Sequence, residues 1–352
     1  MKISVPVSEF KEVVSTIAPM ARLTKSIGVS AMNGRIILMV AGEEISMEAT
    51  VDCVVHENGS TFLPSEETHA ALGTMSPDGV VDISTHNTLV MLRCGGLLLD
   101  LPTPEGSVTS LPEPEAAPLE ADGGGLALCI ARVQEYAKKS IHASFCLECL
   151  RLEMKDGYLC VIAIGFGGAA MGIAGTPARG NLEGGALITR EAAMFAMRIM
   201  ATGPCKVWIS EGAVLFSCGC YRLEVRQVNG KYPNWHGMVP PKRVPIEVPS
   251  EEIVSAMRQV SLVGEDRDCV HYHLSQERLT ISRVAPRGKV VREIPIAHQD
   301  RVVECDVSYA KLMPSLLHAP KGNAVRLYIP EKEEMAMHVG YDGARFYVGT
   351  LD

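Results

Sequence analysis

The sequence contains one pattern three times, and this repetition limits the possible folds more than any other feature. Each copy opens with a short stretch of alternating apolar residues that continues into an amphipathic stretch, at residues 1–17, 126–141 and 245–260. A period of two is typical of a strand, and apolar residues spaced three and four apart are typical of a helix. The 352 residues therefore divide into three similar copies, each within the usual size range of a domain.

Turns, helices and strands follow each opening in the same order. A turn comes first, marked by Asn33-Gly34 and Asp156-Gly157 in the first two copies. These dipeptides favour tight hairpins, because both central residues of a type I′ turn need positive φ angles. Each copy then continues into a second helix, expected at residues 64–73, 189–200 and 307–317.

Hydroxyl side chains stand where these second helices begin. The predicted N-caps are Ser65, Thr189 and Ser308, since an oxygen there can accept a hydrogen bond from the first turn. A pair of strands closes each copy, at residues 79–84 with 88–93, 205–210 with 213–217, and 324–329 with 335–339. Two short helices among many short strands predict an α+β fold, in which the helices pack on antiparallel sheets.

Composition favours a cytoplasmic protein of several domains. Hydrophobic residues make up 47% of the chain, but no stretch approaches the roughly 18 consecutive apolar residues that a membrane span needs. Met1 leads directly into the first predicted strand rather than into a signal peptide, so we expect the chain to stay in the cytoplasm. The eleven cysteines are an odd number scattered among predicted strands, as expected of small core residues in a reducing compartment.

Two linkers separate the copies. Residues 112–125 have no apolar periodicity and are dense in proline, glycine and acidic residues, and residues 239–244 form a shorter and stiffer connection. Both lie just before an opening of the repeat. We therefore predict domains at residues 1–120, 121–242 and 243–352.

Several short motifs occur along the chain in an order that resembles one protein family. They are the opening Met1–Val5, the segment Gly230–Pro240, the run Asp306–Tyr309 and the closing strand Phe346–Asp352. Together these motifs resemble those of the bacterial DNA sliding clamps, the beta subunit family of DNA polymerase III. The resemblance covers the whole chain.

The resemblance implies a DNA-clamp fold and a non-enzymatic function. Two subunits of three domains would close head to tail into a homodimer ring around double-stranded DNA, with helices lining the pore and sheets forming the outer wall. Such a ring is a processivity factor for DNA replication, because it raises the effective concentration of the polymerase at the primer end. It would bind the replicative polymerase, the clamp loader and other proteins that carry the clamp-binding motif. The alternative is a clamp-fold accessory protein with an altered partner groove and non-standard partners.

Charge is compatible with a ring that is basic only on its inner surface. The formal net charge is −8, which argues against an ordinary protein that reads a DNA groove through one basic patch. Basic residues nevertheless occur on or beside the predicted helices, where they could contact phosphates independently of DNA sequence. The predicted DNA-facing residues are Arg22, Lys25, Arg132, Lys138, Lys139, Arg190, Arg198 and Arg258. A solvated helix face is the simpler explanation for any one of them.

The family resemblance also implies an apolar groove that receives a short linear peptide. The matching positions are Leu147, Ile164, Phe166, Pro233, Met238, Val348 and Leu351. The basic side chains that the family carries nearby are replaced here by Gly167, Gly168 and Gly237. We therefore expect peptide binding to depend on hydrophobic residues, and the standard motif to bind weakly. Alternatively, Ile164 and Phe166 fill the domain core, since a strand alternates its faces.

A dimer interface is implied between the first domain of one subunit and the third domain of the other. The apolar residues that match it best are Leu97 and Leu99 on a predicted edge strand, and Leu262 and Val263 after the third opening. Burial in a head-to-tail pair would remove apolar surface that a monomer should not expose. These residues could also pack within their own domains.

Catalytic, cofactor and metal sites are not predicted. Cys146 and Cys149 have zinc-like spacing, but on a strand the two sulfurs would point to opposite faces. His271 and His273 share one face of a predicted strand, which is more typical of a polar outer face than of a metal site. The glycine-rich stretches lack the Gly-Lys-Ser/Thr ending of a phosphate loop, and no nucleophile elbow occurs.

Overall fold

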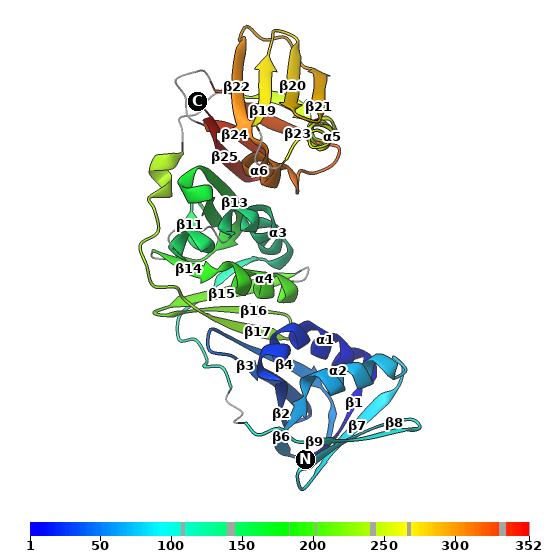
Figure 1. Ribbon diagram of the computed structural model, residues 1–352. Helices are drawn as coiled ribbons and strands as arrows, with labels where there is room; N and C mark the ends of the chain where they lie inside the picture. The colour runs from blue at the N-terminus through cyan, green and yellow to red at the C-terminus, as the bar shows by residue number, and fades with distance from the viewer. Residues whose placement is uncertain are drawn as a thin grey trace. The chain divides into compact units, whose positions relative to one another are not determined.

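The computed structural model describes residues 1–106, 110–138, 145–182, 184–200, 203–239, 244–265, 269–330 and 336–351 (Figure 1). Only the backbone is described for Arg22, Leu23, Phe145 and Leu351. Helices and antiparallel strands alternate along the chain, which confirms the α+β class. Within the described part, no helix is both long and apolar enough to cross a membrane.

The first and third predicted openings are confirmed, because each is a strand that runs directly into a helix. The second is misplaced: its strand and helix begin within the predicted linker 112–125, and the residues from 126 onward, expected as a strand, are helical. The three pairs of strand and helix are β1 (Lys2–Pro6) with α1 (Val7–Thr24), β10 (Leu119–Asp122) with α3 (Gly123–Val133), and β18 (Ile246–Pro249) with α5 (Ser250–Val260). Apolar side chains at helical spacing bury one face of each long helix. In α1 the fully buried side chains include Phe10, Val14, Ile17 and Ala21, spaced four, three and four residues apart.

The predicted second helices are also present, although the third is shorter than expected. They are α2 (Ser65–Thr74), α4 (Arg190–Ile199) and α6 (Tyr309–Leu312), and the last continues as the 3₁₀ turn η5 (Met313–Leu316). Pro314 lies at the start of this turn. Since proline has no backbone N–H to donate, it interrupts the α-helical bonding pattern there.

The predicted N-caps differ in outcome. The Thr189 hydroxyl accepts a hydrogen bond from the Ala192 amide at 3.2 Å, which confirms that cap. Ser308 stands in the N-cap position of α6 but makes no side-chain cap bond. The prediction for Ser65 is wrong, because this residue is the first of α2 and its hydroxyl donates to the carbonyl of Ala21, which links α2 to α1.

Residues Met1–Gly124 and Met194–Gln227 form one compact unit with two antiparallel sheets. The smaller sheet has the order β5 (Val54–Glu57), β1, β7 (Val80–His86), β8 (Leu89–Cys94) and β9 (Leu97–Pro102). The larger has the order β10, β15 (Pro204–Ser210), β16 (Ala213–Cys218), β17 (Tyr221–Arg226), β4 (Ile45–Asp52), β3 (Arg35–Ala41), β2 (Ser26–Met32) and β6 (Gly59–Pro64). Helices α1 and α2 lie side by side in this unit (Figure 1).

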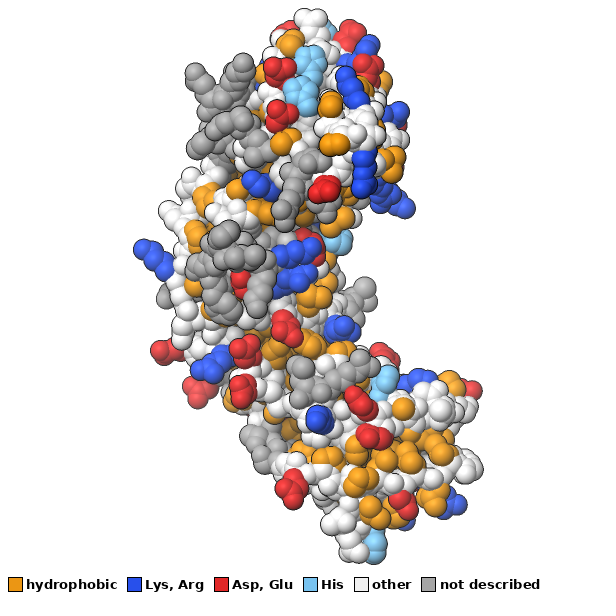
Figure 2. Space-filling model, viewed as in Figure 1, with side chains coloured by type: hydrophobic (Ala, Val, Ile, Leu, Met, Phe, Trp, Pro, Cys, Tyr) orange, Lys and Arg blue, Asp and Glu red, His pale blue; other side chains and the backbone are white. Residues whose placement is uncertain are grey.

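The end of the smaller sheet is apolar on its surface. Strand β9 pairs with β8 alone among the described strands, so β9 is an edge strand, as predicted. Figure 2 shows hydrophobic side chains gathered over β7, β8 and β9. On the edge strand β9, Leu97 and Leu98 have exposed fractions of 36% and 65%.

Residues Gly125–Ala193 and Val228–Asp352 form the other unit. One of its sheets has the order β14 (Gly185–Thr189), β11 (Cys149–Lys155), β12 (Tyr158–Gly165), β13 (Ala170–Arg179), β25 (Ala344–Leu351), β24 (Ala336–Tyr341), β23 (Ala324–Tyr328) and β18. The other consists of β21 (Gly288–Pro295), β20 (Arg278–Ala285), β19 (Cys269–Leu274) and β22 (Val303–Ser308).

Strand pairing between copies explains why the chain has two compact units although its sequence has three copies. Strand β17 of the second copy pairs with β4 of the first, with Tyr221 opposite Ala49. Strand β13 of the second copy pairs with β25 of the third, with Ile173 opposite Arg345. The second copy thus contributes strands to both units, and the domain boundaries at residues 120 and 242 stay predictions.

The hairpin turns follow the predicted chemistry. Asn33 and Gly34 have φ angles of 54° and 75° between β2 and β3. Asp156 and Gly157 have φ angles of 52° and 80° between β11 and β12. Positive values at both central positions are those that a type I′ turn requires.

The Thr189 cap provides a test of local stability. Thr189→Ala should destabilise α4 by about 1 kcal/mol, because the Ala192 amide loses its acceptor. This corresponds to about fivefold faster hydrogen exchange of the first amides of α4, if they exchange by local opening. Ser308→Ala is the matched control and should change exchange in α6 very little. Equal effects of the two substitutions would contradict this assignment.

Candidate DNA-facing helices and partner groove

Several helices carry a basic side chain in their last turn. These residues are Arg132 in α3, Arg198 in α4, Arg258 in α5 and Lys311 in α6. Cations at this end of a helix interact favourably with the helix dipole. Helix α2 differs, since it has no basic residue in its last turn and has Glu66 and Glu67 in its first.

Three of the predicted DNA-facing cations are exposed. Arg198 and Arg258 project from their helix ends, and Lys25 follows α1 in a left-handed conformation with a φ of 61°. No described carboxylate forms an ion pair with any of the three. Their charges are therefore available to an anionic ligand.

Arg132 has a structural role instead. Its side chain is buried, with 5% of the residue exposed, and Nη1 donates to the Asp342 carbonyl at 2.7 Å. Its guanidinium also lies 5.2 Å from the centre of the Tyr341 ring. A buried cation needs such partners to offset the loss of its water. We therefore leave Arg132 out of the DNA-facing set.

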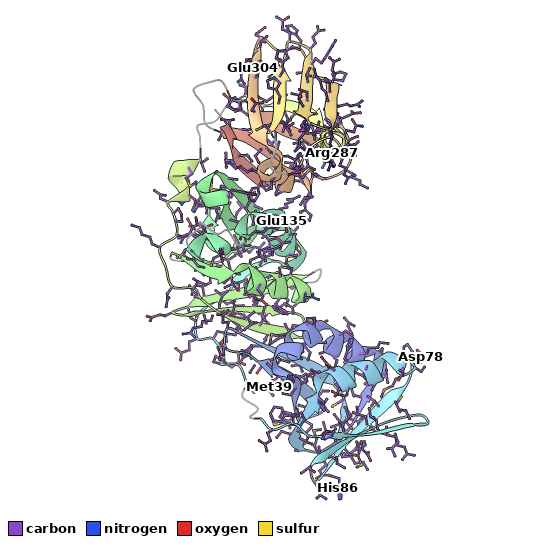
Figure 3. All side chains as sticks on the ribbon, in the orientation of Figure 1. Met39, Asp78, His86, Glu135, Arg287 and Glu304 are labelled. Atoms are coloured by element: carbon purple, nitrogen blue, oxygen red, sulfur yellow. A yellow bond between two sulfur atoms is a disulfide. The ribbon has the colours of Figure 1, made fainter. Side chains whose placement is uncertain are left out.

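Arg190 and Lys138 share one carboxylate, Glu135, which Figure 3 labels. Arg190 Nη2 lies 3.0 Å from Glu135 Oε1 and its Nε donates to the Gln134 carbonyl at 3.1 Å, while Lys138 forms an ion pair with Glu135. Burial raises the pKa of Glu135, but the hydrogen bonds and charges of Lys138 and Arg190 outweigh this effect, so the pKa lies below its ordinary value. Both predicted DNA-facing residues are thus partly neutralised.

Sequence reasoning missed Glu135, although its spacing of three residues from Lys138 is a usual signal for an ion pair along a helix. Two further predicted DNA-facing positions are untested. The side chain of Arg22 and all of Lys139 lie outside the described residues.

The predicted groove residues do not lie on one face of the sheet. Ile164 is opposite Met171, whereas Val348 is opposite Ala170. Because directly opposite residues share a face and neighbours along a strand do not, Ile164 and Val348 point to opposite faces. Both are fully buried, so neither offers surface to a peptide. For Ile164, the alternative that it fills the core is confirmed.

The remaining groove residues lie on three short 3₁₀ turns and the segment beside them. Leu147 is half-buried on η2 (Phe145–Glu148), Phe166 is 39% exposed on η3 (Phe166–Gly168), and Met238 is 36% exposed on η4 (Trp235–Met238). Pro233 is exposed just before η4. The alternative that Phe166 fills the core is wrong, because its ring reaches only the edge of the core at Tyr136, 6.3 Å between centres. The side chain of Leu351 is not described.

The segment that contains η4 is anchored to the sheet by one acidic side chain. Trp235 is buried and its Nε1 donates to Glu153 Oε2 at 3.2 Å, while Arg151 Nε donates to the same oxygen at 2.7 Å. Burial acts to raise the pKa of Glu153, but the hydrogen bonds from Arg151, Trp235 and His236 outweigh it and hold the pKa below its ordinary value. Glu153 therefore keeps its negative charge at neutral pH.

The predicted interface residues are partly exposed. Leu262 is 75% exposed after α5, and Val263 and Leu99 are half-buried. Leu97 lies on the edge strand β9 described above. The four residues thus keep apolar surface that a second subunit could cover.

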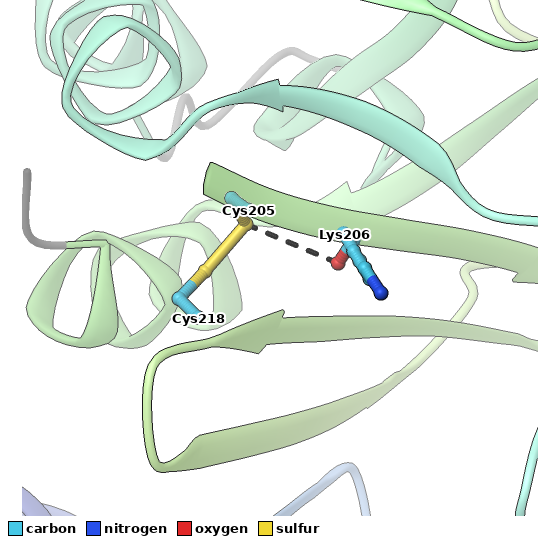
Figure 4. Close-up of a disulfide and its surroundings, with 3 residues drawn as sticks. All are labelled: Cys205, Lys206 and Cys218. Atoms are coloured by element: carbon cyan, nitrogen blue, oxygen red, sulfur yellow. Dashed lines mark hydrogen bonds between the residues drawn. A yellow bond between two sulfur atoms is a disulfide. The ribbon is translucent and has the colours of Figure 1, made fainter. Parts of the chain in front are cut away.

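The structure pairs two cysteines and corrects the expectation that they are separate core residues. Cys205 and Cys218 stand directly opposite each other on β15 and β16 and form a disulfide, with 4.6 Å between their Cα atoms (Figure 4). Opposite residues in a ladder share a face, which brings the two sulfurs together. Cys205 also lies beside the Lys206 carbonyl.

The residues considered for metal binding have other surroundings. Cys146 lies on η2 rather than on a strand, and both Cys146 and Cys149 contact the core cluster around Ile164 and Trp235, so the argument from opposite strand faces is wrong. His271 is paired with Asp306 at 3.0 Å. Within the described ranges, no group of three metal-ligating side chains occurs.

Glu135 gives a pH-dependent prediction. Its pKa is lowered in the folded state, so its stabilising effect should be complete above the ordinary value of 4.5 and should disappear as the pH falls through the folded value. Glu135→Gln should therefore lower the free energy of unfolding by about 1 kcal/mol at neutral pH. The difference from the unsubstituted protein should shrink below pH 4.5 in urea titrations. Glu105→Gln, at an exposed site, is the control, and a difference independent of pH would contradict the assignment.

Comparison with known proteins identifies the fold. No protein-family model matches the sequence, and no curated protein sequence matches it. Solved structures do match over the full length: the DNA polymerase III subunit beta from Pseudomonas aeruginosa (15% identity, TM-score 0.89, 100% of both chains), the Caulobacter crescentus pol III beta (15%, 0.86, 100% of both chains), and the DnaN sliding clamp from Bartonella birtlesii bound to griselimycin (14%, 0.87, 100% of both chains). The chain therefore has the fold of the bacterial DNA polymerase III beta sliding clamps.

Proposed function

We propose that this chain is a cytoplasmic, non-enzymatic DNA sliding clamp that encircles duplex DNA as a homodimer and tethers the replicative polymerase. The observation that carries the proposal is the likeness of all three copies to bacterial clamps over the full length of both chains. Exposed cations at the ends of α4 and α5 support it. Positive charge at the same place in both helices is suited to DNA, whose phosphates recur at regular intervals.

The proposed mechanism is topological and electrostatic. Lys25, Arg198 and Arg258 contact phosphates, with Arg190 and Lys138 contributing less because Glu135 shares their charge. Phosphate contacts have no sequence preference, so the ring can move along DNA without a preferred position. The polymerase stays near the primer end because it is attached to a ring that cannot leave a closed circle.

Partner binding is proposed at the three 3₁₀ turns. Leu147, Phe166, Pro233 and Met238 offer apolar surface, and methionine adapts to anchors of different shape. The polymerase, the clamp loader and other proteins with the clamp-binding motif would insert hydrophobic side chains there. The positions that carry basic residues in the family are glycines here, so polar contacts contribute little.

The second candidate function is an accessory clamp with dedicated partners. Two observations favour it: Ile164 and Val348, expected in the groove, are both in the core, and Phe166 with a φ of 54° projects from a glycine-rich turn. A groove built from different residues selects different peptides. This candidate shares the ring and the DNA contacts with the first.

Ring formation and DNA retention test the proposed function together. The protein should have the mass of a dimer in light scattering, and should stay on a nicked circular plasmid but leave it after the plasmid is cut. Leu262→Asp should give a folded monomer that the circle does not retain, because a charge replaces an apolar contact. Replacing Lys25, Arg198 and Arg258 with Ala should reduce the salt slope of retention by about one unit for each lost phosphate contact.

Lys206→Ala, on strand β15 rather than on a helix, is the matched control and should leave the slope unchanged. Equal retention on circular and linear DNA would contradict the proposal.

The groove is tested separately with a labelled standard clamp-binding peptide. Met238→Asp should weaken its binding about tenfold, since an uncompensated charge replaces an apolar anchor site. Substitution of the peptide's hydrophobic residues should matter more than substitution of its leading glutamine. Tight binding that Met238→Asp leaves untouched would place the groove elsewhere.

A further inference from the structure

A cavity of about 500 Å³ lies in the second unit and belongs to neither of the sites described above. It covers part of the sheet at β12, β13 and β25 and reaches η4 on one side and β23 on the other. None of Leu147, Phe166, Pro233 and Met238 lines it. We call it the basic cavity, after Lys155, Arg326 and Arg345, three of the residues that line it.

Two of its arginines lie in one row across the sheet. Arg345 on β25 and Arg326 on β23 are both directly opposite Gly340 on β24. Directly opposite residues share a face, so the two guanidinium groups stand on the same side with no side chain between them. Two guanidinium groups on either side of an open position can both donate hydrogen bonds to one carboxylate placed between them.

Arg345 and Tyr347 are two residues apart on β25 and therefore lie on the same face, beside the cavity. Burial raises the pKa of Tyr347, which more than offsets the opposite effect of Arg345, so the hydroxyl stays neutral. No described carboxylate forms an ion pair with Arg326 or Arg345. Both side chains are exposed beside the cavity, and Glu247 on β18 is directly opposite Arg326.

The opposite wall carries a further basic side chain, Lys155. Lys155 Nζ lies 4.9 Å from the centre of the Trp235 ring and donates to His236 Nδ1 at 3.3 Å. Since an ammonium group can only donate, Nδ1 accepts, and Nε2 carries the proton that is donated to Glu153 Oε1 at 3.0 Å. Glu153 thus fixes Trp235 and His236 together, and Lys155 is held above them.

The floor is small and apolar. Cys160 is directly opposite Gly175, and Ile173, two residues before Gly175 and therefore on the same face, is directly opposite Arg345. Glycine has no side chain, so the cavity can accept a ligand side chain between its charged walls. The backbone of β12, β13 and β25 is paired in the sheet ladder and offers few amides to a ligand. Phosphate sites commonly use such free amides, whereas this cavity must bind an anion through side chains.

The lining therefore carries three basic side chains and one carboxylate, Asp156. The volume is several times that of a simple anion. We propose that the basic cavity binds an acidic linear segment of a partner protein, with a carboxylate between Arg326 and Arg345 and an apolar side chain over Ile173 and Gly175. This site is separate from the groove on the 3₁₀ turns and does not depend on the proposed DNA function.

The test uses the full chain and a short labelled peptide in which Glu alternates with Leu, followed by fluorescence anisotropy. Arg326→Ala and Arg345→Ala should each weaken binding about tenfold, the loss expected for a charged hydrogen bond. Arg345→Lys should recover only part of the lost affinity, because a lysine ammonium group cannot donate the two parallel hydrogen bonds of a guanidinium group. Arg287→Ala, at an exposed arginine outside the cavity that Figure 3 labels, should leave binding unchanged.

Three comparisons decide between ligand classes. A matched peptide with Gln in place of Glu should bind much more weakly, and Met238→Asp should leave binding of the acidic peptide unchanged. Equal binding of the Gln peptide, or no loss in the two alanine variants, would overturn the proposal. Displacement of the peptide by equimolar inorganic phosphate or by short duplex DNA would also overturn it, in favour of a simple anion or a nucleic acid.

Discussion

Strand pairing between copies is the interaction on which the rest of this structure depends. Each copy has helices that bury one face and strands that need partners, yet the second copy places β17 against the first copy and β13 against the third. Backbone hydrogen bonds across these pairs satisfy groups that would otherwise form exposed edges, which invite aggregation. The positions of the helices and turns follow from the two sheets that result.

The fold could be predicted from the sequence where the signal is local. Alternation, helical spacing and the Asn33-Gly34 and Asp156-Gly157 turns each depend on a few neighbouring residues, and these elements are present as expected, except that the strand predicted from residue 126 is part of α3. The pairing of Cys205 with Cys218 could not be predicted, because it depends on the register between two strands. The same limit explains Ile164 and Val348, since an offset of one position reverses a side chain's face.

The candidate DNA-facing set shows a different limit. A sequence gives the sign of a charge but not its partner, so Arg132, Arg190 and Arg198 looked equivalent along the chain. In the structure one is buried against a carbonyl, one shares a carboxylate and one is exposed. Burial and pairing, which depend on distant segments, separate a structural cation from one that is free to bind.

The hydrogen bond from Arg132 to the Asp342 carbonyl has a mechanical consequence. Asp342 and Gly343 form the tip of the β24–β25 hairpin, and Gly343 lines the basic cavity. The peptide unit between Asp342 and Gly343 is therefore bonded to α3 through Arg132 and also lies at the cavity. A ligand that shifts Gly343 must either break this bond or carry the end of α3 with it. If the basic cavity binds such a ligand, its occupancy and the position of that helix share one coupling free energy, which acts equally in both directions.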